Sequence, residues 1–225
     1  MGLRRIIVDL ALFDLDKTLI CADSNSLWMR WLVSQGYAPE TLIAEEEALM
    51  AQYCQGALSL EAYMSRTLAP LSGMGTLTVN GWVRRFIHRD IMPRVYPAAR
   101  ERLAWHQQRG DTIMLISASG EHLMAPIAQR LGAHGALAVG VEIVDDRYSG
   151  APCAVMAWRA GKATRLADWR ALQQENRFQQ TWAYSDSITD LPLLALADHA
   201  CAVNPDAQLL DEARQRGWQV AHWEK

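Results

Sequence analysis

The pattern of apolar and polar residues divides the chain into segments of different periodicity. Residues 6–13 (IIVDLALF) form an apolar, β-rich run that stops at Asp14, which predicts a buried strand leading into a polar loop. In residues 21–91 the apolar residues recur at helical spacing, and glycines and prolines interrupt them at intervals. This middle block predicts about four consecutive helices.

The pattern after Pro93 alternates between helical and extended segments. Helices are predicted over residues 96–110, 119–132, 162–176 and 205–217, and a further helix begins at 191. Strands are predicted over 112–117, 136–144, 181–185, 201–203 and 218–223, and the DDRYSG turn after 144 indicates a hairpin. Strand–helix alternation of this kind predicts an α/β fold, a Rossmann-like doubly wound parallel sheet with helices on both faces.

The helical block interrupts this fold directly after its first strand. We therefore expect a Rossmann-like core made of residues 1–20 and 92–225, with residues 21–91 inserted as an all-helical cap. In doubly wound sheets ligands bind beyond the carboxyl ends of the strands. A cap inserted after the first strand would lie above that position.

Composition and charge exclude several classes of partner. The chain has 225 residues, half of them apolar, and a net charge of −3, so a nucleic-acid partner is not expected. No run of 18 apolar residues occurs, so no membrane span is expected. The four cysteines show neither a CxxC pair nor metal-ligand spacing, which favours buried thiols over disulfides and a cytoplasmic protein. The sequence does not determine the oligomeric state.

Polar residues stand at four places next to the predicted strands. The first strand leads into DLDKT at 14–18, and the second leads into SAS at 117–119. Lys162 follows the hairpin and opens a helix, and a later strand leads into SDSITD at 185–190. Because parallel strands bring their carboxyl ends to one edge of the sheet, these side chains are expected to gather there.

The residue types at this edge fit phosphoryl transfer. Asp14 and Asp16 can act as nucleophile and general acid/base. Mg²⁺ usually binds one or two carboxylates together with phosphate and water, and Asp186 can meet Asp14 across such an ion. Ser117 can hydrogen-bond a phosphate oxygen, and Lys162 can neutralise its charge.

The same segments resemble the motifs of the haloacid dehalogenase (HAD) superfamily. DLDKTL at 14–19 resembles motif I, and LISAS at 115–119 resembles motif II. GKATRL around Lys162 resembles motif III, and YSDSITDLPLL at 184–194 resembles motif IV. All four occur in the family's order. The helical insert between motifs I and II resembles the cap of the phosphoserine-phosphatase-like branch, subfamily IB.

The resemblance implies a role for each matched residue. Asp14 would be the nucleophile, forming an aspartyl-phosphate, and a Mg²⁺ ligand. Asp16 would give its main-chain carbonyl to the metal, while its side chain would protonate the leaving oxygen and then activate water. Asp186 would be the second carboxylate on the metal. The supporting residues would be Ser117, Ala118 and Lys162 at the phosphate, Thr18 in the loop, and Asp190 at Lys162 or at a metal-bound water.

Each of these residues also has an ordinary structural interpretation. Asp14 and Asp16 are typical turn residues at the end of a strand. Ser117 and Ser119 could cap the next helix, and Asp190 precedes a helical run that it could cap. Lys162 taken alone would be a solvated helix residue.

Two rival functions share part of this pattern. A receiver-like signalling protein also forms a phospho-aspartate beside Mg²⁺, but it lacks an acid/base at the position of Asp16. Haloacid dehalogenases proper need no metal and also lack this second aspartate. A phosphotransferase on the same scaffold, passing the phosphate to another alcohol, stays open.

The substrate is expected to be a small phosphorylated metabolite. Phosphoserine phosphatases commonly place a glutamate after motif I to meet the substrate amine, whereas this chain has Asp23 in CADSNS. Their motif II usually continues Ser-Gly-Gly, whereas this chain has SASG at 117–120. We therefore expect an amine-bearing phosphomonoester, such as phosphoserine or histidinol phosphate, held by Asp23 with Trp28 nearby.

Overall fold

A single mixed sheet forms the centre of the molecule. The computed structural model describes residues 8–153, 160–173 and 178–225. In these residues seven strands are ordered β4-β3-β2-β1-β5-β6-β7. Their bounds are Val8–Phe13 (β1), Thr112–Gly120 (β2), Gly135–Val144 (β3), Arg147–Cys153 (β4), Phe178–Ser185 (β5), His199–Val203 (β6) and Gln219–Ala221 (β7). All neighbours run parallel except the β3–β4 hairpin. The predicted doubly wound α/β fold is confirmed.

Helices cover both faces of the sheet. Successive residues of β1 point to opposite faces, so each face of this strand packs against a different set of helices. Leu10 and Leu12 are fully buried in one cluster with residues of α7, α8 and α9. Ala11 and Phe13 are buried in the other cluster with residues of α5, α6 and the helices that follow β1. The bounds of these five helices are Pro97–Arg109 (α5), Glu121–Arg130 (α6), Ala160–Leu172 (α7), Leu191–Leu194 (α8) and Ala207–Arg216 (α9).

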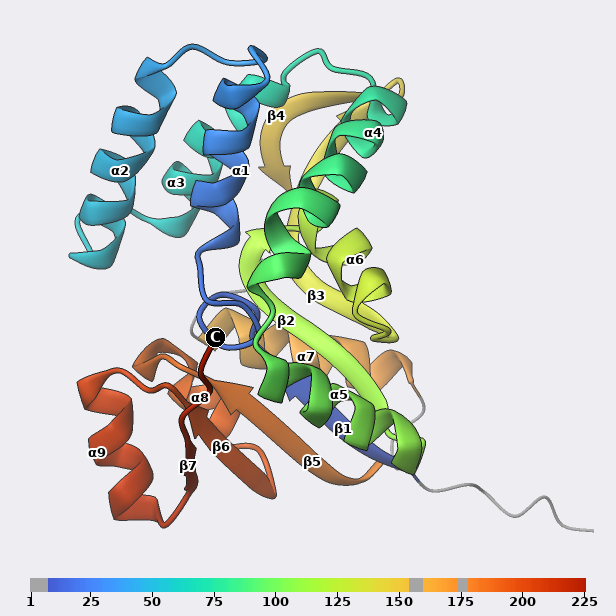
Figure 1. Cartoon of the computed structure of the whole chain (residues 1–225), viewed down its shortest axis with the longest axis vertical. Coiled ribbons are helices and arrows are strands. Elements are labelled where there is room, and N and C mark those ends of the chain that lie inside the picture. The colour runs from blue at the N-terminus through green and yellow to red at the C-terminus, as the bar shows by residue number, and fades with distance from the viewer. Residues whose placement is uncertain (1–7, 154–159, 174–177) are drawn as a thin grey trace, which may run out of the picture.

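Four helices lie between β1 and α5, as the periodicity predicts. They are Ser24–Ser34 (α1), Thr41–Cys54 (α2), Leu60–Leu68 (α3) and Thr76–Phe86 (α4), and a π-turn at Ile87–Ile91 (η2) extends the last of them. Asp23 and Ser59 cap α1 and α3 through side-chain hydrogen bonds. Figure 1 shows these helices at one end of the molecule, beyond the point where β1 leaves the sheet.

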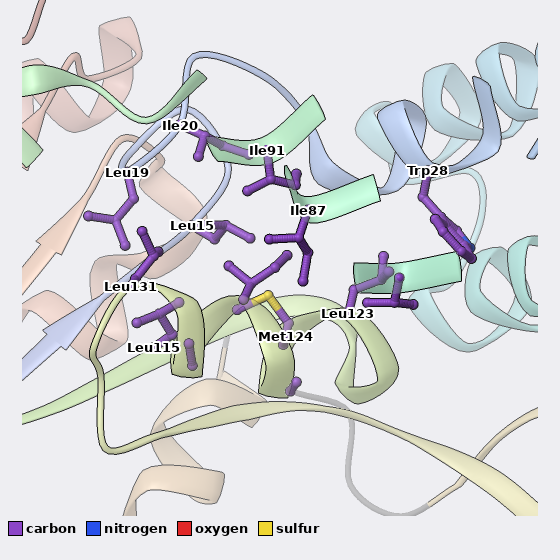
Figure 2. Packing of buried hydrophobic residues seen from close by; sticks show 14 of the residues in the cluster. Leu15, Leu19, Ile20, Trp28, Ile87, Ile91, Leu115, Leu123, Met124 and Leu131 are labelled. Atoms are coloured by element: carbon purple, nitrogen blue, oxygen red, sulfur yellow. The ribbon is translucent and has the colours of Figure 1, made fainter. Parts of the chain in front are cut away.

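The helical insert and the sheet share one hydrophobic cluster. Figure 2 shows Ile87 and Ile91 lying against Leu123 and Met124 of α6, with Leu15 of the loop after β1 beside them. All five side chains are at most 4% exposed. The insert is therefore packed continuously onto the face of the sheet that α6 covers.

The β3–β4 hairpin also contacts the insert. The main-chain N–H of Gly73 donates to Tyr148 (2.8 Å), and that of Tyr148 donates to Met74 (2.9 Å). The Arg147 guanidinium donates to the carbonyl oxygen of Gly73 at 2.7 Å. These bonds join a hairpin of the core to the segment between α3 and α4, a contact that the sequence pattern does not reveal.

Several predicted boundaries differ from the structure. The helix predicted from residue 119 begins at Glu121, because Gly120 keeps an extended backbone and still pairs with Val139 of β3. The helix predicted from 191 is only four residues long. Residues 6–7 of the first predicted strand and 174–176 of a predicted helix lie outside the described residues. All four cysteines are free, but of the predicted buried thiols only Cys201 is buried, and Cys54 is exposed.

No helix within the described ranges combines the length and the apolar character that crossing a membrane requires.

Candidate active site

Strand register brings the candidate residues to one edge of the sheet. Phe13, the last residue of β1, pairs with Leu115 of β2 on one side and with Tyr184 of β5 on the other. The residues that follow these three positions include Asp14, Ser117, Ser185 and Asp186. Three segments far apart in sequence therefore meet at the carboxyl ends of three adjacent strands.

Lys162 lies at the centre of the gathered side chains. It is the third residue of α7 and is only 4% exposed. Its Nζ donates to Asp14 Oδ1 at 2.8 Å and to Asp190 Oδ2 at 2.7 Å. Burial alone would lower the pKa of Lys162, but the two carboxylates raise it above its usual value. The lysine is therefore held charged, and it is not a solvated helix residue.

Asp190 is fixed by two donors. Its Oδ2 accepts from Lys162 and also from Ser185 Oγ at 2.7 Å. Although it occupies the position before α8, its side chain makes no capping hydrogen bond there. Its Oδ1 is buried and has no hydrogen-bond partner among the residues that the structure describes.

The electrostatics of Asp14 and Asp186 reflect a local excess of negative charge. Burial raises the pKa of Asp14 to about 6, against the opposing effect of Lys162. Burial, followed by the charges of Asp14 and Asp190, raises the pKa of Asp186 to about 7. Thr18 Oγ1 donates to Asp186 Oδ1 at 3.3 Å. Asp14 and Asp190 thus share Lys162 as their ion-pair partner, and Asp186 has no ion pair among the residues that the structure describes.

These residues fit a hard divalent cation. An additional positive charge would balance the excess carboxylate, and the donors are oxygens, which Mg²⁺ prefers. The buried, unpaired Oδ1 of Asp190 adds an oxygen that a metal-bound water could satisfy. Across residues 8–153, 160–173 and 178–225, no three His, Cys, Asp or Glu side chains form a metal-binding cluster. The predicted ligand set is smaller, with two side chains, Asp14 and Asp186, and the main-chain carbonyl of Asp16.

Asp16 has a different environment from Asp14. Its Oδ1 accepts from the main-chain N–H of Ser24 at 2.7 Å, and its Oδ2 accepts from Ser119 Oγ at 3.2 Å. Burial, then the charges of Asp23 and Asp14, raise its pKa well above the usual value. A carboxyl group with a raised pKa can carry a proton near neutral pH, as a general acid requires.

The turn that holds these two aspartates is strained. Lys17 adopts φ of +59°, a left-handed conformation uncommon for a residue with a side chain. Its main-chain N–H donates to Ala22 at 3.2 Å, which closes the loop. Asp14 and Asp16 both precede this closed turn, which fixes the backbone directly after them.

The motif II residues line the same edge. Ser117 is 1% exposed, and its Oγ accepts from the main-chain N–H of Ser119 at 3.1 Å. Ala118 follows it and is half-buried. Ser119 does not cap α6, because Gly120 occupies the N-cap position. Instead its Oγ bonds Asp16 and lies 3.0 Å from the hydroxyl of Ser24.

Ser24, Ser119 and Ser185 belong to this site although the motifs assign them no role. Ser119 and Ser185 stand within the matched segments, so their position in the sequence is a usable signal. Ser24 has no such signal, because its contact depends on how α1 docks over motif I.

The two residues predicted to contact substrate occupy different environments. Asp23 is half-buried, and its Oδ1 accepts from the main-chain N–H of Ser26 at 2.8 Å. Trp28 is fully buried, stacked on Trp31 with ring centroids 5.1 Å apart. Its Nε1 has no hydrogen-bond partner in the described part of the chain. Contact of either residue with a substrate stays a prediction.

Comparison with known proteins agrees with this arrangement. Residues 11–195 match the family model of the haloacid dehalogenase-like hydrolases. The chain belongs to this family. It is therefore an enzyme with a hydrolase fold, and the four motifs that its sequence contains fall within the matched range.

The relatives extend along nearly the whole chain. A histidinol-phosphatase of Neisseria meningitidis serogroup C (strain 8013) is 36% identical over 220 residues, covering 96% of this chain and 99% of that protein. A solved protein of unknown function from Bordetella pertussis Tohama I has a TM-score of 0.90 and 32% identity, covering 95% and 98% of the two chains. A phosphoserine phosphatase solved as a phospho-aspartyl intermediate analogue has a TM-score of 0.68 at 16% identity, covering 97% and 94%, and shows the same fold.

Proposed function

We propose that this chain is a Mg²⁺-dependent phosphomonoester hydrolase that works through an aspartyl-phosphate on Asp14. The observation that carries the proposal is the Lys162 ion-pair cluster, in which one buried lysine holds Asp14 and Asp190 beside Asp186. The match to the hydrolase family and the relative named histidinol-phosphatase support it.

The proposed reaction has two steps, transfer of the phosphoryl group to Asp14 and its hydrolysis, and Asp16 acts in both. An oxygen of Asp14 attacks phosphorus while Asp16 gives its proton to the leaving alcohol oxygen. Asp16, now ionised, takes a proton from water, and the resulting hydroxide attacks phosphorus. Phosphate leaves, and both aspartates return to their starting states. The hydrogen bonds from Ser24 and Ser119 orient Asp16 for both proton transfers.

The remaining residues would stabilise charge. Lys162 would pair with the phosphoryl oxygens, and Ser117 with the main chain at Ala118 would hydrogen-bond them. Asp14, Asp186 and the carbonyl of Asp16 would hold Mg²⁺, with Asp190 acting through Lys162 or a water. When bound, Mg²⁺ supplies positive charge that offsets the charge of the transferring phosphoryl group.

We assign residues 1–20 and 92–225 to the catalytic core and residues 21–91 to a cap. The hydrogen bonds of Ser24 with Asp16 and with Ser119 support this division, because they join the start of α1 to motif I and motif II. Asp23 stands next to this contact, so the substrate is assigned as a small amine-bearing phosphomonoester such as histidinol phosphate or phosphoserine.

Phosphate release from a panel of phosphomonoesters, with Mg²⁺ and with EDTA, tests the proposal. Wild type should release phosphate only with Mg²⁺, and Asp14→Asn should lose about 10⁴-fold or more because its partners cannot replace the nucleophile. Full activity in EDTA, or an active Asp14→Asn, would rule the mechanism out.

A further inference from the structure

A buried carboxylate without a cationic partner lies in the helical insert. Glu46 of α2 is only 3% exposed. Within the described residues no lysine, arginine or histidine forms an ion pair with it, and the nearby Arg30 pairs with Glu47 instead. Burial raises the pKa of Glu46, with a smaller contribution from the charge of Asp23. Because burying a carboxylate is unfavourable unless it is paired, its counter-ion is expected from outside the chain.

One oxygen of this carboxylate is fixed and the other is free. Glu46 Oε1 accepts from Ser26 Oγ at 2.8 Å and from Tyr63 OH at 2.9 Å, and Asn25 Nδ2 donates to the same tyrosine oxygen at 3.3 Å. Oε2 accepts no hydrogen bond from the side chains or main chain that the structure describes. The carboxylate is thus oriented by neighbours that leave one acceptor available.

Space exists beside Glu46. It lines a cavity of about 560 Å³ between α2 and the residues that follow α1 and α3. The lining also includes Leu42, Leu49 and the exposed Arg66, which makes no ion pair with Glu46 in the described structure. The carboxylate is therefore not packed on all sides, although none of the residues that line this cavity belongs to the reacting centre.

The first turn of α1 connects this carboxylate to the reacting centre. The main-chain N–H of Ser24 donates to Asp16, and two residues later Ser26 Oγ donates to Glu46. Two residues of an α-helix span only about 3 Å along its axis. Asp16 and Glu46 therefore lie close to the same turn of α1. Asp23 caps that turn and lies close enough for its charge to act on both Asp16 and Glu46. Asp16, Asp23 and Glu46 are therefore three carboxylates gathered at the start of α1.

We propose that Glu46, together with Asp23, determines substrate specificity by binding nitrogen cations or N–H donors on the leaving alcohol, and that this alcohol carries no carboxylate. The inference rests on the proposed phosphatase function. Asp23 and Glu46 would together bind an amino alcohol that has a second N–H donor further from the phosphate. A substrate with its own carboxylate would bring a third negative charge between them, which disfavours phosphoserine.

The test is a comparison of kcat/KM for three esters, each with Mg²⁺ present. The esters are histidinol phosphate, which has two nitrogen groups and no carboxylate, phosphoserine, which has an amine and a carboxylate, and p-nitrophenyl phosphate, which has no cation. Glu46→Gln keeps the size of the side chain and removes its charge. Loss of a charged hydrogen bond should lower kcat/KM for histidinol phosphate about 10- to 100-fold more than for p-nitrophenyl phosphate, mainly through KM. The discrimination against phosphoserine should shrink.

Glu47→Gln is the matched control, because Glu47 is the exposed neighbour that pairs with Arg30. It should leave the ratios among the three esters unchanged. If Glu46→Gln does not fold, Tyr63→Phe removes one of the two donors to Oε1 and should shift the same ratio in the same direction. Titration calorimetry of histidinol, the free alcohol, gives a readout besides turnover, and binding should weaken in the variant.

Equal loss on all three esters, or unchanged ratios, would overturn the recognition role of Glu46. Either result would leave the proposed hydrolysis standing if wild type still releases phosphate and Asp14→Asn does not. Failure of wild type to release phosphate from every ester would instead reject the proposed function itself.

Discussion

Asp14 and Asp16 are separated by one residue, yet their neighbours give them different chemistry. Asp14 pairs with the buried Lys162, which opposes the effect of burial on its pKa. Asp16 has no cationic partner among the described residues and is bonded by Ser24 and Ser119. Lys162 therefore favours the ionised form of Asp14, whereas the raised pKa of Asp16 favours its protonated form. This difference supports the assignment of nucleophile and acid within a single tripeptide.

The buried His122 should make the free energy of unfolding depend on pH. It is 7% exposed, packs edge-on against Trp28 and Tyr148, and neither ring nitrogen has a hydrogen-bond partner in the described structure. Burial lowers its pKa to about 3. The unfolded chain binds a proton at this histidine below about pH 6.5 while the folded chain does not, so stability falls as pH falls from about 6.5 toward 3.

His122→Leu should remove this contribution. Between pH 7.5 and pH 5, wild type should lose about 2 kcal/mol more unfolding free energy than the variant. Urea unfolding at the two pH values measures the difference, and His88→Gln, at an exposed histidine, should retain the wild-type dependence. Identical pH dependence in wild type and His122→Leu would show that the histidine is not neutral when folded.

The site residues differ in how far the sequence predicts them. Asp14, Asp16, Lys162 and Asp186 stand at fixed places relative to strands, so their gathering follows from parallel topology. Glu46 could not be predicted in this way, because a glutamate on an amphipathic helix is ordinarily exposed. Its burial depends on the packing of α2 against α1 and α3, which periodicity alone does not specify.

At the scale of elements, the β3–β4 hairpin connects the core to the insert. Gly150 of β4 has φ of +86°, and a Cβ atom added there would lie 3.0 Å from Ser72 Cβ. The glycine therefore permits both the backbone conformation and the close approach of the segment after α3. Gly110, the C-cap of α5, also has positive φ at +76°, but its Cβ would meet nothing within 4 Å.

These two glycines give a matched pair of variants. Both Gly150→Ala and Gly110→Ala should lose about 1 kcal/mol from the left-handed backbone. Gly150→Ala should lose about 1 kcal/mol more from the steric conflict with Ser72. Thermal or urea unfolding of the two variants measures the difference. Equal destabilisation would mean that the hairpin does not press against the insert at this position.

Most helices and strands were predictable from periodicity and end signals. Pro97 and Gly110 bound α5 where the pattern places it. The start of α6 was predicted two residues early, because a serine after a strand is a usual cap whereas here Ser119 stays in β2 and bonds Asp16. Local sequence propensity does not predict the tertiary contact between Ser119 and Asp16.

In the molecule as a whole, the candidate active site is a region of excess negative charge that a bound cation would balance. Asp14 and Asp190 share Lys162, whereas Asp186 has no ion-pair partner in the described structure. The pKa of Asp186 is raised to about 7 by burial and by the charges of Asp14 and Asp190. A carboxylate with a raised folded-state pKa stabilises the protein at low pH and loses that contribution as pH rises through about 7. Above pH 7, in the metal-free protein, the ionised Asp186 is therefore repelled by the neighbouring carboxylates of Asp14 and Asp190.

Asp186→Asn should separate stability from metal binding. At pH 8 without metal, the variant should be more stable than wild type by about 1 kcal/mol or more, because it removes one repelling charge. Adding Mg²⁺ should raise the Tm of wild type but not of the variant, since binding to the folded state alone is stabilising. A Mg²⁺-induced shift of the same size in both proteins would contradict the role of Asp186 as a ligand.

The site of phosphorylation tests the role of Asp14 as nucleophile most directly. Asp16→Asn, which should slow hydrolysis of the intermediate by about 10²-fold or more, is mixed with Mg²⁺ and p-nitrophenyl phosphate, whose leaving group needs no proton from Asp16. The protein is then quenched in acid and mapped by mass spectrometry after borohydride reduction. We predict a labelled residue at Asp14, absent from the Asp14→Asn, Asp16→Asn double variant. Label on any other residue, or phosphate release with no label on the protein, would contradict the account.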